Sequence, residues 1–398
     1  MYRFHLFGKI SNFKIKKSLI ILYLAGFVLA LSSAFPAYIN SSFIENFVDT
    51  RMVGLFFVAA NIATFFAMLF FPAMIRRFSN LLSSKLVMLL NIVSLMILMM
   101  SPAPIWLFVF FIGMWITSNL LWINMDLFVE SFTDNSSTGK TRAIYFTFMN
   151  LGWIFSPMLA SRLVIGNDHY NLVYLVSAIL LLFFYFVIVF NEKRVSKVVA
   201  YDKMNLWQTI VDFWKNPSLK GVYFVSFFLN LFFNSAVVFI PIYLHSVIGF
   251  DWSVLGVMFS IMLIPFVLFE IPAGFLADKY LGEKELMFTG LLILMISLLL
   301  FFFVKSSSIF VWGGILFFSR IGAALIEAMR ESRFFKIVDA ENVSHINFLR
   351  TSYPLGYLVG SGLGVLILSF YEVQYLFLFL AAIFLFSFYF VYIIKDSK

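Results

Sequence analysis

Twelve runs of mostly apolar residues recur along the 398-residue chain, each 17 to 25 residues long. An α-helix rises about 1.5 Å per residue, so each run is long enough to cross roughly 30 Å of hydrocarbon. Only helices and closed barrels satisfy their backbone hydrogen bonds in lipid, and barrel strands alternate in polarity rather than run apolar. We therefore predict an all-α polytopic membrane protein with twelve transmembrane helices near 18–40, 51–75, 85–101, 105–129, 141–165, 172–190, 221–244, 253–277, 286–304, 309–330, 351–371 and 374–394.

The composition excludes several other classes of protein. Hydrophobic residues make up 62% of the chain and charged residues only 12%, whereas a soluble domain carries roughly 25% charge. Such a chain has too little polar surface for a soluble enzyme or a disordered scaffold. The net charge of +8 sits in short loops beside apolar runs, so we expect no nucleic-acid partner. The absence of cysteine excludes disulfides, iron–sulfur clusters and thiol catalysis.

The charges of the loops predict the orientation in the membrane. Of the 28 Lys and Arg residues, 24 fall in the two ends of the chain and the even-numbered connections, against three in the odd-numbered connections. Because positive loops stay on the cytoplasmic side, we expect a multi-pass protein of the cell (inner or plasma) membrane with both termini in the cytoplasm. A signal peptide is the alternative reading of the first run, since Ser32–Ser33–Ala34 resembles a cleavage site. The apolar stretch continues to Ile39, however, which favours a retained first span.

The two halves of the chain match each other, in order, at one spacing. The matching segments are Tyr38–Ser41 with Tyr243–Ser246, Asp126 and Glu130 with Glu327 and Glu331, Leu151–Trp153 with Leu355–Tyr357, and Phe184–Val187 with Phe388–Val391. Their offsets are 205, 201, 204 and 204 residues, close to half of the chain. Six spans repeated in parallel predict two six-helix bundles related by a pseudo-two-fold axis along the membrane normal, with a site between them.

The repeat also defines the expected domains. They are an N-terminal six-helix bundle over 1–190, a cytoplasmic linker over 191–220 and a C-terminal six-helix bundle over 221–398. Within the linker, Met204–Trp214 has the pattern of a short amphipathic helix that lies at the membrane surface. We interpret the linker as a cover for the underside of the bundle, with a regulatory role as the alternative.

The loop after the eighth span carries the most specific motif. It reads Gly-Phe-Leu-Ala-Asp-Lys-Tyr-Leu-Gly-Glu-Lys over 274–284, which resembles the signature loop of the major facilitator superfamily of secondary transporters, with one extra residue before the second glycine. We expect Gly274 to allow a close helix approach and Asp278 to accept backbone N–H bonds at a neighbouring helix start. The basic residues are expected to contact carboxylates or lipid phosphates. The motif residues are Gly274, Asp278, Lys279, Gly282 and Lys284.

Other segments resemble the same family less closely. The first-half copy of the loop, over 72–80, keeps a basic residue but lacks the acid and both glycines. In the fifth span, Asn150–Ala160 is similar to the family's glycine–proline motif, which is associated with efflux by antiport, although Ser156 and Ala160 stand where glycines are usual. Arg320–Ala324 is similar to an arginine–glycine element that the family usually carries in its fourth span, displaced here to the tenth.

Charges gather at the predicted cytoplasmic ends of the spans. Asp126 and Glu130 are four residues apart and share a helix face, and the repeat places a second such acidic pair at 327 and 331. With nearby basic residues they predict a gate that closes by salt bridges when the cavity faces outward; static helix-end charges that follow the topology are the alternative. The expected gate residues are Arg76, Arg77, Asp126, Glu130, Arg142, Glu327, Glu331, Arg333 and Arg350, together with the motif residues above.

Two charges lie deeper in the predicted spans. Glu270 precedes Asp278 by eight residues, or about 12 Å along a helix. A carboxylate at that depth must be protonated, paired or hydrated, which makes Glu270 a candidate for proton coupling. Arg320 reaches a similar depth and is a candidate partner for Glu270 or an anchor for substrate. A static structural pair is the alternative.

The remaining polar and aromatic side chains of the spans are candidates for binding a substrate. They are Asn61, Asn119, Asn150, Asn230, Asn234 and Trp122, with Arg320. Hydrogen bonding between helices is the alternative role for each amide, and packing is the alternative for the indole. An amide-rich, aromatic lining with few fixed charges fits neutral or amphipathic solutes.

These features predict a secondary active transporter, not an enzyme, which moves a small solute by alternating access coupled to a proton gradient, by symport or antiport. The alternatives are a lipid or amphiphile flippase of the same fold and a polytopic membrane enzyme, but the longest loops lack a catalytic cluster. The four histidines are scattered, and Gly139–Thr141 lacks the rest of a phosphate-binding loop. We therefore expect a monomer without metal, nucleotide or other cofactor, whose partners are the bilayer, a small-molecule substrate and protons.

Overall fold

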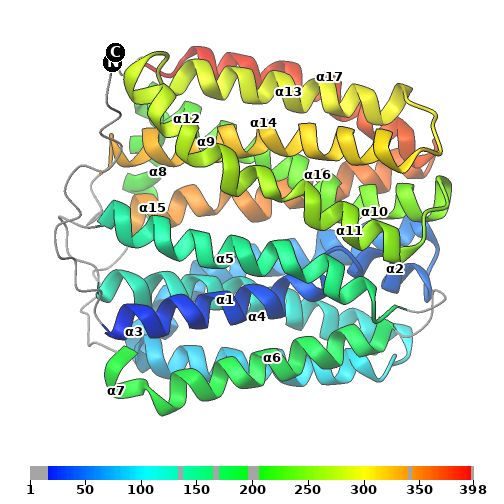
Figure 1. Cartoon of the computed structure of the whole chain (residues 1–398). Coiled ribbons are helices and arrows are strands. Elements are labelled where there is room, and N and C mark those ends of the chain that lie inside the picture. The colour runs from blue at the N-terminus through cyan, green and yellow to red at the C-terminus, as the bar shows by residue number, and fades with distance from the viewer. Residues whose placement is uncertain (1–16, 133–137, 165–169, 196–205, 339–342, 396–398) are drawn as a thin grey trace, which may run out of the picture.

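The structure of the chain, a computed structural model, describes residues 17–132, 138–164, 170–195, 206–338 and 343–395. This part of the chain folds into helices and turns, without a strand. Ten of its helical segments are long and apolar enough to cross a membrane. The long helices lie side by side, with the N-terminal half of the chain (1–190) packed against the C-terminal half (221–398) (Figure 1).

The helices follow the predicted spans within a few residues at most ends. In the first half and the linker they are α1 (Lys17–Ala37), α2 (Asn40–Glu45), α3 (Thr50–Met99), α4 (Pro104–Ser131), α5 (Thr138–Ser161), α6 (Tyr170–Phe190), α7 (Glu192–Val195) and α8 (Leu206–Lys215). In the second half they are α9 (Pro217–Asn234), α10 (Ile240–Ile242), α11 (Trp252–Met262), α12 (Ile264–Lys279), α13 (Glu283–Phe303), α14 (Ile309–Phe335), α15 (Val343–Arg350), α16 (Ser352–Leu368) and α17 (Val373–Tyr392).

Helix α3 contains two of the predicted spans. It runs for 50 residues and is interrupted at Ser79, whose φ of 70° and ψ of 161° are not helical. The Ser79 hydroxyl accepts a hydrogen bond from the Leu82 N–H at 3.4 Å, so it caps the second segment. With α3 counted as two spans and α5 added to the apolar helices, the arrangement agrees with the predicted twelve.

Prolines at matching positions disturb the first span of each half. Pro36 lies near the end of α1, and the chain turns at Tyr38 before α2 begins. Pro241 lies in α10, which is flanked by wider π-helical turns over Ser235–Phe239 and Tyr243–Val247. Proline lacks an N–H and clashes with the preceding turn, so a break or a widened turn is expected at both places.

The repeat is visible in how the helices pack. In the first half α1 packs on α5 and α6; in the second half α9 packs on α16 and α17. Gly152 of α5 lies so close to α1 that a Cβ there would be 2.9 Å from the Phe27 carbonyl oxygen. Gly356 of α16 lies equally close to α9, with 2.8 Å to the Phe227 carbonyl oxygen. Both halves therefore use a glycine at the same repeat position for the same helix contact.

The two ends of the bundle differ in chemistry. We call the end at which α7, α8 and α15 lie, on the left in Figure 1, the basic end, because the loops predicted to be cytoplasmic meet there. The other end, at which α2 and α10 lie, is called the opposite end. Near the basic end α7 is tied to α3, since Lys85 donates a 2.6 Å hydrogen bond to Glu192 that lowers the pKa of this carboxyl group.

Small residues bring the halves together towards the opposite end. There α3 packs on α16 and α5 packs on α11. A Cβ at Gly54 would lie 3.2 Å from the Ser361 carbonyl oxygen, and one at Gly256 would lie 2.7 Å from the Pro157 carbonyl oxygen. The Ser260 hydroxyl also accepts a 3.0 Å hydrogen bond from the backbone N–H of Met158. The contact between the halves is thus close and mostly without charge at this end.

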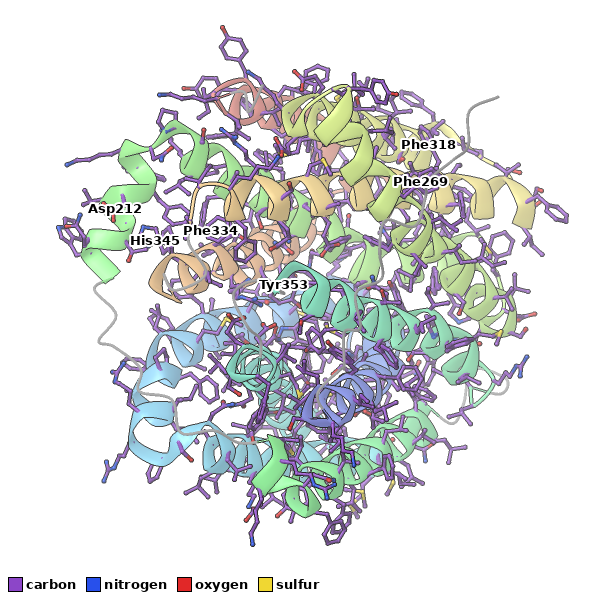
Figure 2. All side chains as sticks on the ribbon, turned by 60° about the vertical axis from the view of Figure 1, so that its left-hand side comes forward. Asp212, Phe269, Phe318, Phe334, His345 and Tyr353 are labelled. Atoms are coloured by element: carbon purple, nitrogen blue, oxygen red, sulfur yellow. The ribbon has the colours of Figure 1, made fainter. Side chains whose placement is uncertain are left out.

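The linker helix α8 occupies nearly the predicted range and is amphipathic. Phe213 is buried against Tyr223 and Phe348, whereas Trp207 is exposed. Figure 2 shows Asp212 of this helix beside His345 of α15, with 3.4 Å between the carboxylate oxygen and the imidazole Nε2. Helix α8 therefore packs on the basic end of the second half.

Candidate transport site and gate

One arginine is buried at the middle of the second half. Arg320 of α14 is only 1% exposed, and its guanidinium lies over the rings of Phe232 and Phe233, at 5.4 and 5.9 Å from their centroids. Neither Nε nor Nη1 has a hydrogen-bond partner among the described residues. A buried charge without a paired acid is costly, so this position is the strongest candidate for a ligand contact in the described chain.

Aromatic residues from both halves surround this guanidinium. The phenol groups of Tyr38 and Tyr357 lie within electrostatic range of it. Tyr38 belongs to the first half and stacks on Phe259 at 5.1 Å, so it joins the halves beside the charge. Tyr357 packs near Trp115, with 6.0 Å between the ring centroids. We call Arg320, Phe232, Phe233, Tyr38 and Tyr357 the Arg320 cluster.

Tyr353 extends this aromatic group along α16. Its ring lies 4.5 Å from that of Tyr357, and Figure 2 shows it at the boundary between the two halves. Sequence reasoning named only Arg320 from this region. Tyr38 lies in one of the repeated segments and Tyr357 in another, so the repeat held a signal for both. Phe232 and Phe233 could not be distinguished among 55 phenylalanines.

Three of the predicted substrate amides use their N–H groups on their own helices. Asn61, Asn119 and Asn230 each donate to the carbonyl oxygen four residues earlier, at 2.7, 2.8 and 2.8 Å. Asn61 also accepts a 3.2 Å hydrogen bond from the Trp115 indole, which joins α3 to α4. These contacts account for the burial of Asn61 and Asn230 without a substrate.

The other predicted substrate residues fall into two groups. Asn234 is buried and donates a 2.8 Å hydrogen bond to the Ser361 hydroxyl, while its Oδ1 has no partner among the residues that the structure describes. Asn150 and Trp122 are half-buried, and no hydrogen bond joins their side chains to the described residues. The structure therefore brings only Arg320 of the predicted set into the aromatic cluster between the halves.

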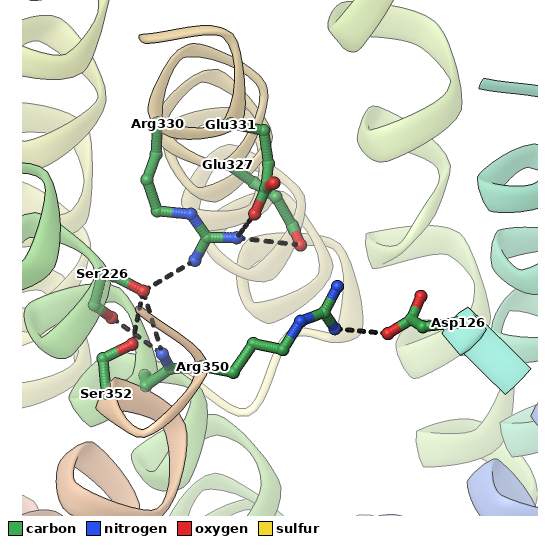
Figure 3. Close-up of polar contacts among 8 residues, drawn as sticks. Asp126, Ser226, Glu327, Arg330, Glu331, Arg350 and Ser352 are labelled. Atoms are coloured by element: carbon green, nitrogen blue, oxygen red, sulfur yellow. Dashed lines mark hydrogen bonds and ion pairs between the residues drawn. The ribbon is translucent and has the colours of Figure 1, made fainter. Parts of the chain in front are cut away.

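An ion pair joins the halves at the basic end (Figure 3). The Nη1 atom of Arg350 lies 2.5 Å from the Oδ2 atom of Asp126, so α4 of the first half is bound to the end of α15. The carboxylate is 16% exposed and the guanidinium 35%. Both residues were predicted to belong to a gate, and the structure brings them together.

The second acidic pair binds an arginine of its own helix (Figure 3). Arg330 lies 2.7 Å from Glu331 and 3.9 Å from Glu327. It also donates a 3.0 Å hydrogen bond to the Ser226 hydroxyl, which is 2.7 Å from the Ser352 hydroxyl. These contacts stay within the second half, and they link α14 to α9 and α16.

The remaining predicted gate residues are spread over the basic end. Arg76 and Arg77 are exposed, Glu130 is half-buried, and buried Arg333 donates a 2.6 Å hydrogen bond to the Lys395 carbonyl oxygen. Arg333 also lines a cavity of about 580 Å³ with Asp212 and Lys215. This cavity lies roughly 20 Å along α14 from Arg320, since thirteen residues separate the two arginines.

The signature loop is described only in part. Gly282 has a φ of 103° and precedes α13 as its N-cap residue, and Lys284 donates a 2.9 Å hydrogen bond to the Tyr392 carbonyl oxygen. At Gly274 a Cβ would meet no described atom within 4 Å, and the close helix approach expected there stays a prediction. Buried Glu283, which sequence reasoning missed, binds Lys336 and Ser332. The side chains of Arg142, Glu270, Asp278 and Lys279 lie outside the described residues.

Comparison with known proteins agrees with this architecture. The family model described as Major Facilitator Superfamily matches residues 18–326 and 253–398. Among solved structures, a nucleoside transporter, NupG (D323A mutant), has a TM-score of 0.75 at 14% identity, over 95% of this chain and 100% of that one. A POT family transporter in complex with 5-aminolevulinic acid has a TM-score of 0.74 at 13% identity, over 96% of each chain.

A third structure, a bacterial homolog of the human lysosomal transporter Spinster in an inward-facing and unoccupied conformation, has a TM-score of 0.66 at 13% identity, over 95% of this chain and 93% of that one. No curated protein matches the sequence. At these identities the structures show the fold alone. The fold is one that helical membrane transporters share. The chain belongs to the major facilitator superfamily.

Proposed function

We propose that this chain is a secondary active transporter that moves a small solute across the membrane by alternating access between its two halves. The ion pair between Asp126 and Arg350 carries this proposal, because it binds the halves at one end through a contact that can break. Towards the opposite end the halves meet through Gly54 and Gly256. A rocking motion of the two halves would separate the ion pair at the basic end while it keeps the glycine contacts towards the opposite end. A solute would be held between these two contacts.

The ion pair is suited to a switch between states of similar free energy. Its members are 16% and 35% exposed, so solvent screens them and the pair is worth about 0.5–1 kcal/mol. A contact of this size changes a population ratio by roughly two- to fivefold. The closed basic end is therefore favoured without being locked.

Proton coupling is part of the proposal, with Glu270 as the carboxylate that gains and loses the proton. Its position supports this role, since α12 carries it about two helical turns before the loop at Asp278. Loop charges support a cell membrane location with cytoplasmic termini, so the basic end faces the cytoplasm.

Spin labels at the two ends test alternating access without a known solute, and the chain has no native cysteine to remove. One pair of labels at Leu82 and Leu281 reports the basic end, and a second pair at Met52 and Val247 reports the opposite end; all four residues are exposed. In nanodiscs, Asp126→Arg should lengthen the first distance and shorten or leave the second, because it replaces an attraction with a repulsion. Pulsed electron–electron double resonance measures both distances between the labels.

A charge swap is the control for this experiment. Asp126→Arg combined with Arg350→Asp restores opposite charges at the same place, so the distances should return towards those of the wild type. If the basic-end distance is the same in the wild type, the single variant and the swap, the ion pair is no gate. If neither end changes its distance in any variant, alternating access is contradicted.

Substitution of Glu270 tests the coupling. Glu270→Gln keeps the shape of the side chain but cannot release a proton. In proteoliposomes with a pH gradient, wild-type protein should move protons when the transported solute is supplied, and the variant should not. A pH-sensitive dye inside the vesicles measures this flux. Unchanged proton movement in the variant removes the coupling role and leaves the transporter proposal standing.

A further inference from the structure

The guanidinium of Arg320, which interacts with Tyr38 but has no acid partner among the described side chains, lies where a solute would be held. Arg320 is the twelfth residue of the 27-residue helix α14, near the middle of the span, and it is almost fully buried. Tyr38, within its electrostatic range, belongs to the other half of the chain. The charge therefore sits beside the boundary along which the halves are proposed to move.

The surroundings of Arg320 leave hydrogen-bond donors without acceptors. A guanidinium has five N–H donors and no acceptor, and here Nε and Nη1 find no acceptor in the described part of the chain. The two phenylalanine rings stabilise the charge through their faces, but this contact is weaker than a carboxylate pair. The nearby phenols of Tyr38 and Tyr357 can donate hydrogen bonds as well. The cluster thus offers positive charge and donors together.

Among the described side chains, the acids of α14, the helix that carries Arg320, do not fill this need; the side chain of Glu270 on α12 lies outside them. Glu327 lies seven residues further along α14, at the basic end, and is paired with Arg330. The rings that enclose Arg320 are apolar and flat, and they favour an apolar or aromatic body next to the charged group. A small inorganic ion would leave these surfaces unused.

We propose that Arg320 binds the negatively charged group of the transported solute, and that the solute is an organic monoanion, such as a carboxylate, with an apolar or aromatic body. This inference rests on the proposed function and names the class of solute for it. One cation at the centre of the described cluster matches one negative charge. Arg320 approaches the solute from the second half, and Tyr38 approaches it from the first.

The first measurement is the thermal unfolding of purified protein in detergent with defined probes. Benzoate and phenylacetate should raise the apparent Tm of the wild type, because they bind the folded form only. Benzamide, benzylamine and sodium chloride are matched neutral, cationic and inorganic probes and should not raise it. In Arg320→Met, affinity for benzoate should fall at least about tenfold, as expected when a charged hydrogen-bonding group is removed.

The second measurement is the Tm without any probe. A buried guanidinium whose partner is a ligand destabilises the protein when that ligand is absent. Arg320→Met should therefore keep or raise the Tm. Arg333→Met is the matched control, because that buried arginine donates a 2.6 Å hydrogen bond to Lys395 within the protein. Its loss should lower the Tm. Arg320→Lys keeps the charge and should retain part of the response to benzoate.

Several results would overturn the anion site. They are an equal shift from benzamide, benzylamine or chloride, no shift from either carboxylate, or a fall in Tm for Arg320→Met as large as that for Arg333→Met. If Arg320→Met and Glu270→Gln each lower the Tm, and the double variant lowers it by less than the sum of the two, Arg320 belongs to a structural ion pair instead. If any of these outcomes is found while the spin-label distances do change in Asp126→Arg, the anion site is rejected and the proposal of a transporter is kept. Distances that never change reject the transporter itself.

Discussion

At the scale of single residues, two glycines set how closely helices approach within each half. Gly152 and Gly356 occupy matching positions, and each faces backbone rather than a flexible side chain. Small residues are favoured between membrane helices because apolar side chains gain little there by leaving lipid. The backbone contact therefore explains why neither position carries one of the chain's many large apolar residues.

Substitution of these glycines should destabilise the protein. Gly152→Ala and Gly356→Ala each place a methyl group within 3 Å of a carbonyl oxygen, and overpacking of this kind costs about 1–3 kcal/mol. Gly313→Ala in α14 is the control, since a Cβ there meets no described atom within 4 Å; it should be neutral or raise stability by up to about 1 kcal/mol. Thermal unfolding in detergent measures all three, and a Tm for Gly152→Ala at or above that of Gly313→Ala contradicts the contact.

The polar residues show what a sequence pattern can and cannot predict at this scale. It singled out Arg320 as a charge deep in a span and placed Asp126 and Arg350 in a gate, without pairing the two. It could not tell that the Asn61 and Asn230 side chains bond to their own helices. Every helical asparagine has a carbonyl oxygen four residues earlier, so the sequence does not show whether its side chain turns towards that oxygen or away from the helix. The side chain of Glu270 lies outside the described residues, so its role stays a prediction.

At the scale of helices, the apolar runs predicted the spans well because lipid imposes both their length and their composition. The interruptions were harder to predict. Ser79 adopts a positive φ that favours glycine, and the neighbouring Asn80 is held by Asn124, whose amide donates a 2.7 Å hydrogen bond to the Asn80 Oδ1. This contact with α4 stabilises the bend between the two segments of α3. Nothing in the local sequence shows that a serine takes this conformation.

Relief of this backbone conformation should stabilise the protein. Ser79→Gly removes a strain of about 1–3 kcal/mol and loses a cap worth only a few tenths of a kcal/mol relative to glycine, so a net gain of about 1 kcal/mol is expected. Ser369→Gly, at the end of α16, is the comparison, because its φ of −69° is ordinary for any residue. It should bring no gain. Equal Tm changes for the two variants would show that Ser79 is not strained.

At the scale of the whole molecule, the internal repeat predicted a pair of related bundles, and the glycine contacts of α5 and α16 repeat as it requires. The contacts between the halves were less predictable, since they depend on the conformation that the transporter adopts as well as on its sequence. Charge alone placed Asp126 and Arg350 in an expected gate at the basic end, but it did not pair them. The approach of α5 to α11 was not predicted, because Gly256 has no special sequence context.

Helix α4 places two of these features on one straight element. It contains no proline after its first residue, and eleven residues separate Trp115, beside the aromatic cluster, from Asp126. A helix without a break, with about 16 Å between Trp115 and Asp126, moves as a rigid unit. Events at its two points are then thermodynamically linked, and such linkage is reciprocal. If a bound solute at the Arg320 cluster weakens the ion pair between Asp126 and Arg350 by some factor, loss of this ion pair must raise the affinity of the cluster for the solute by the same factor.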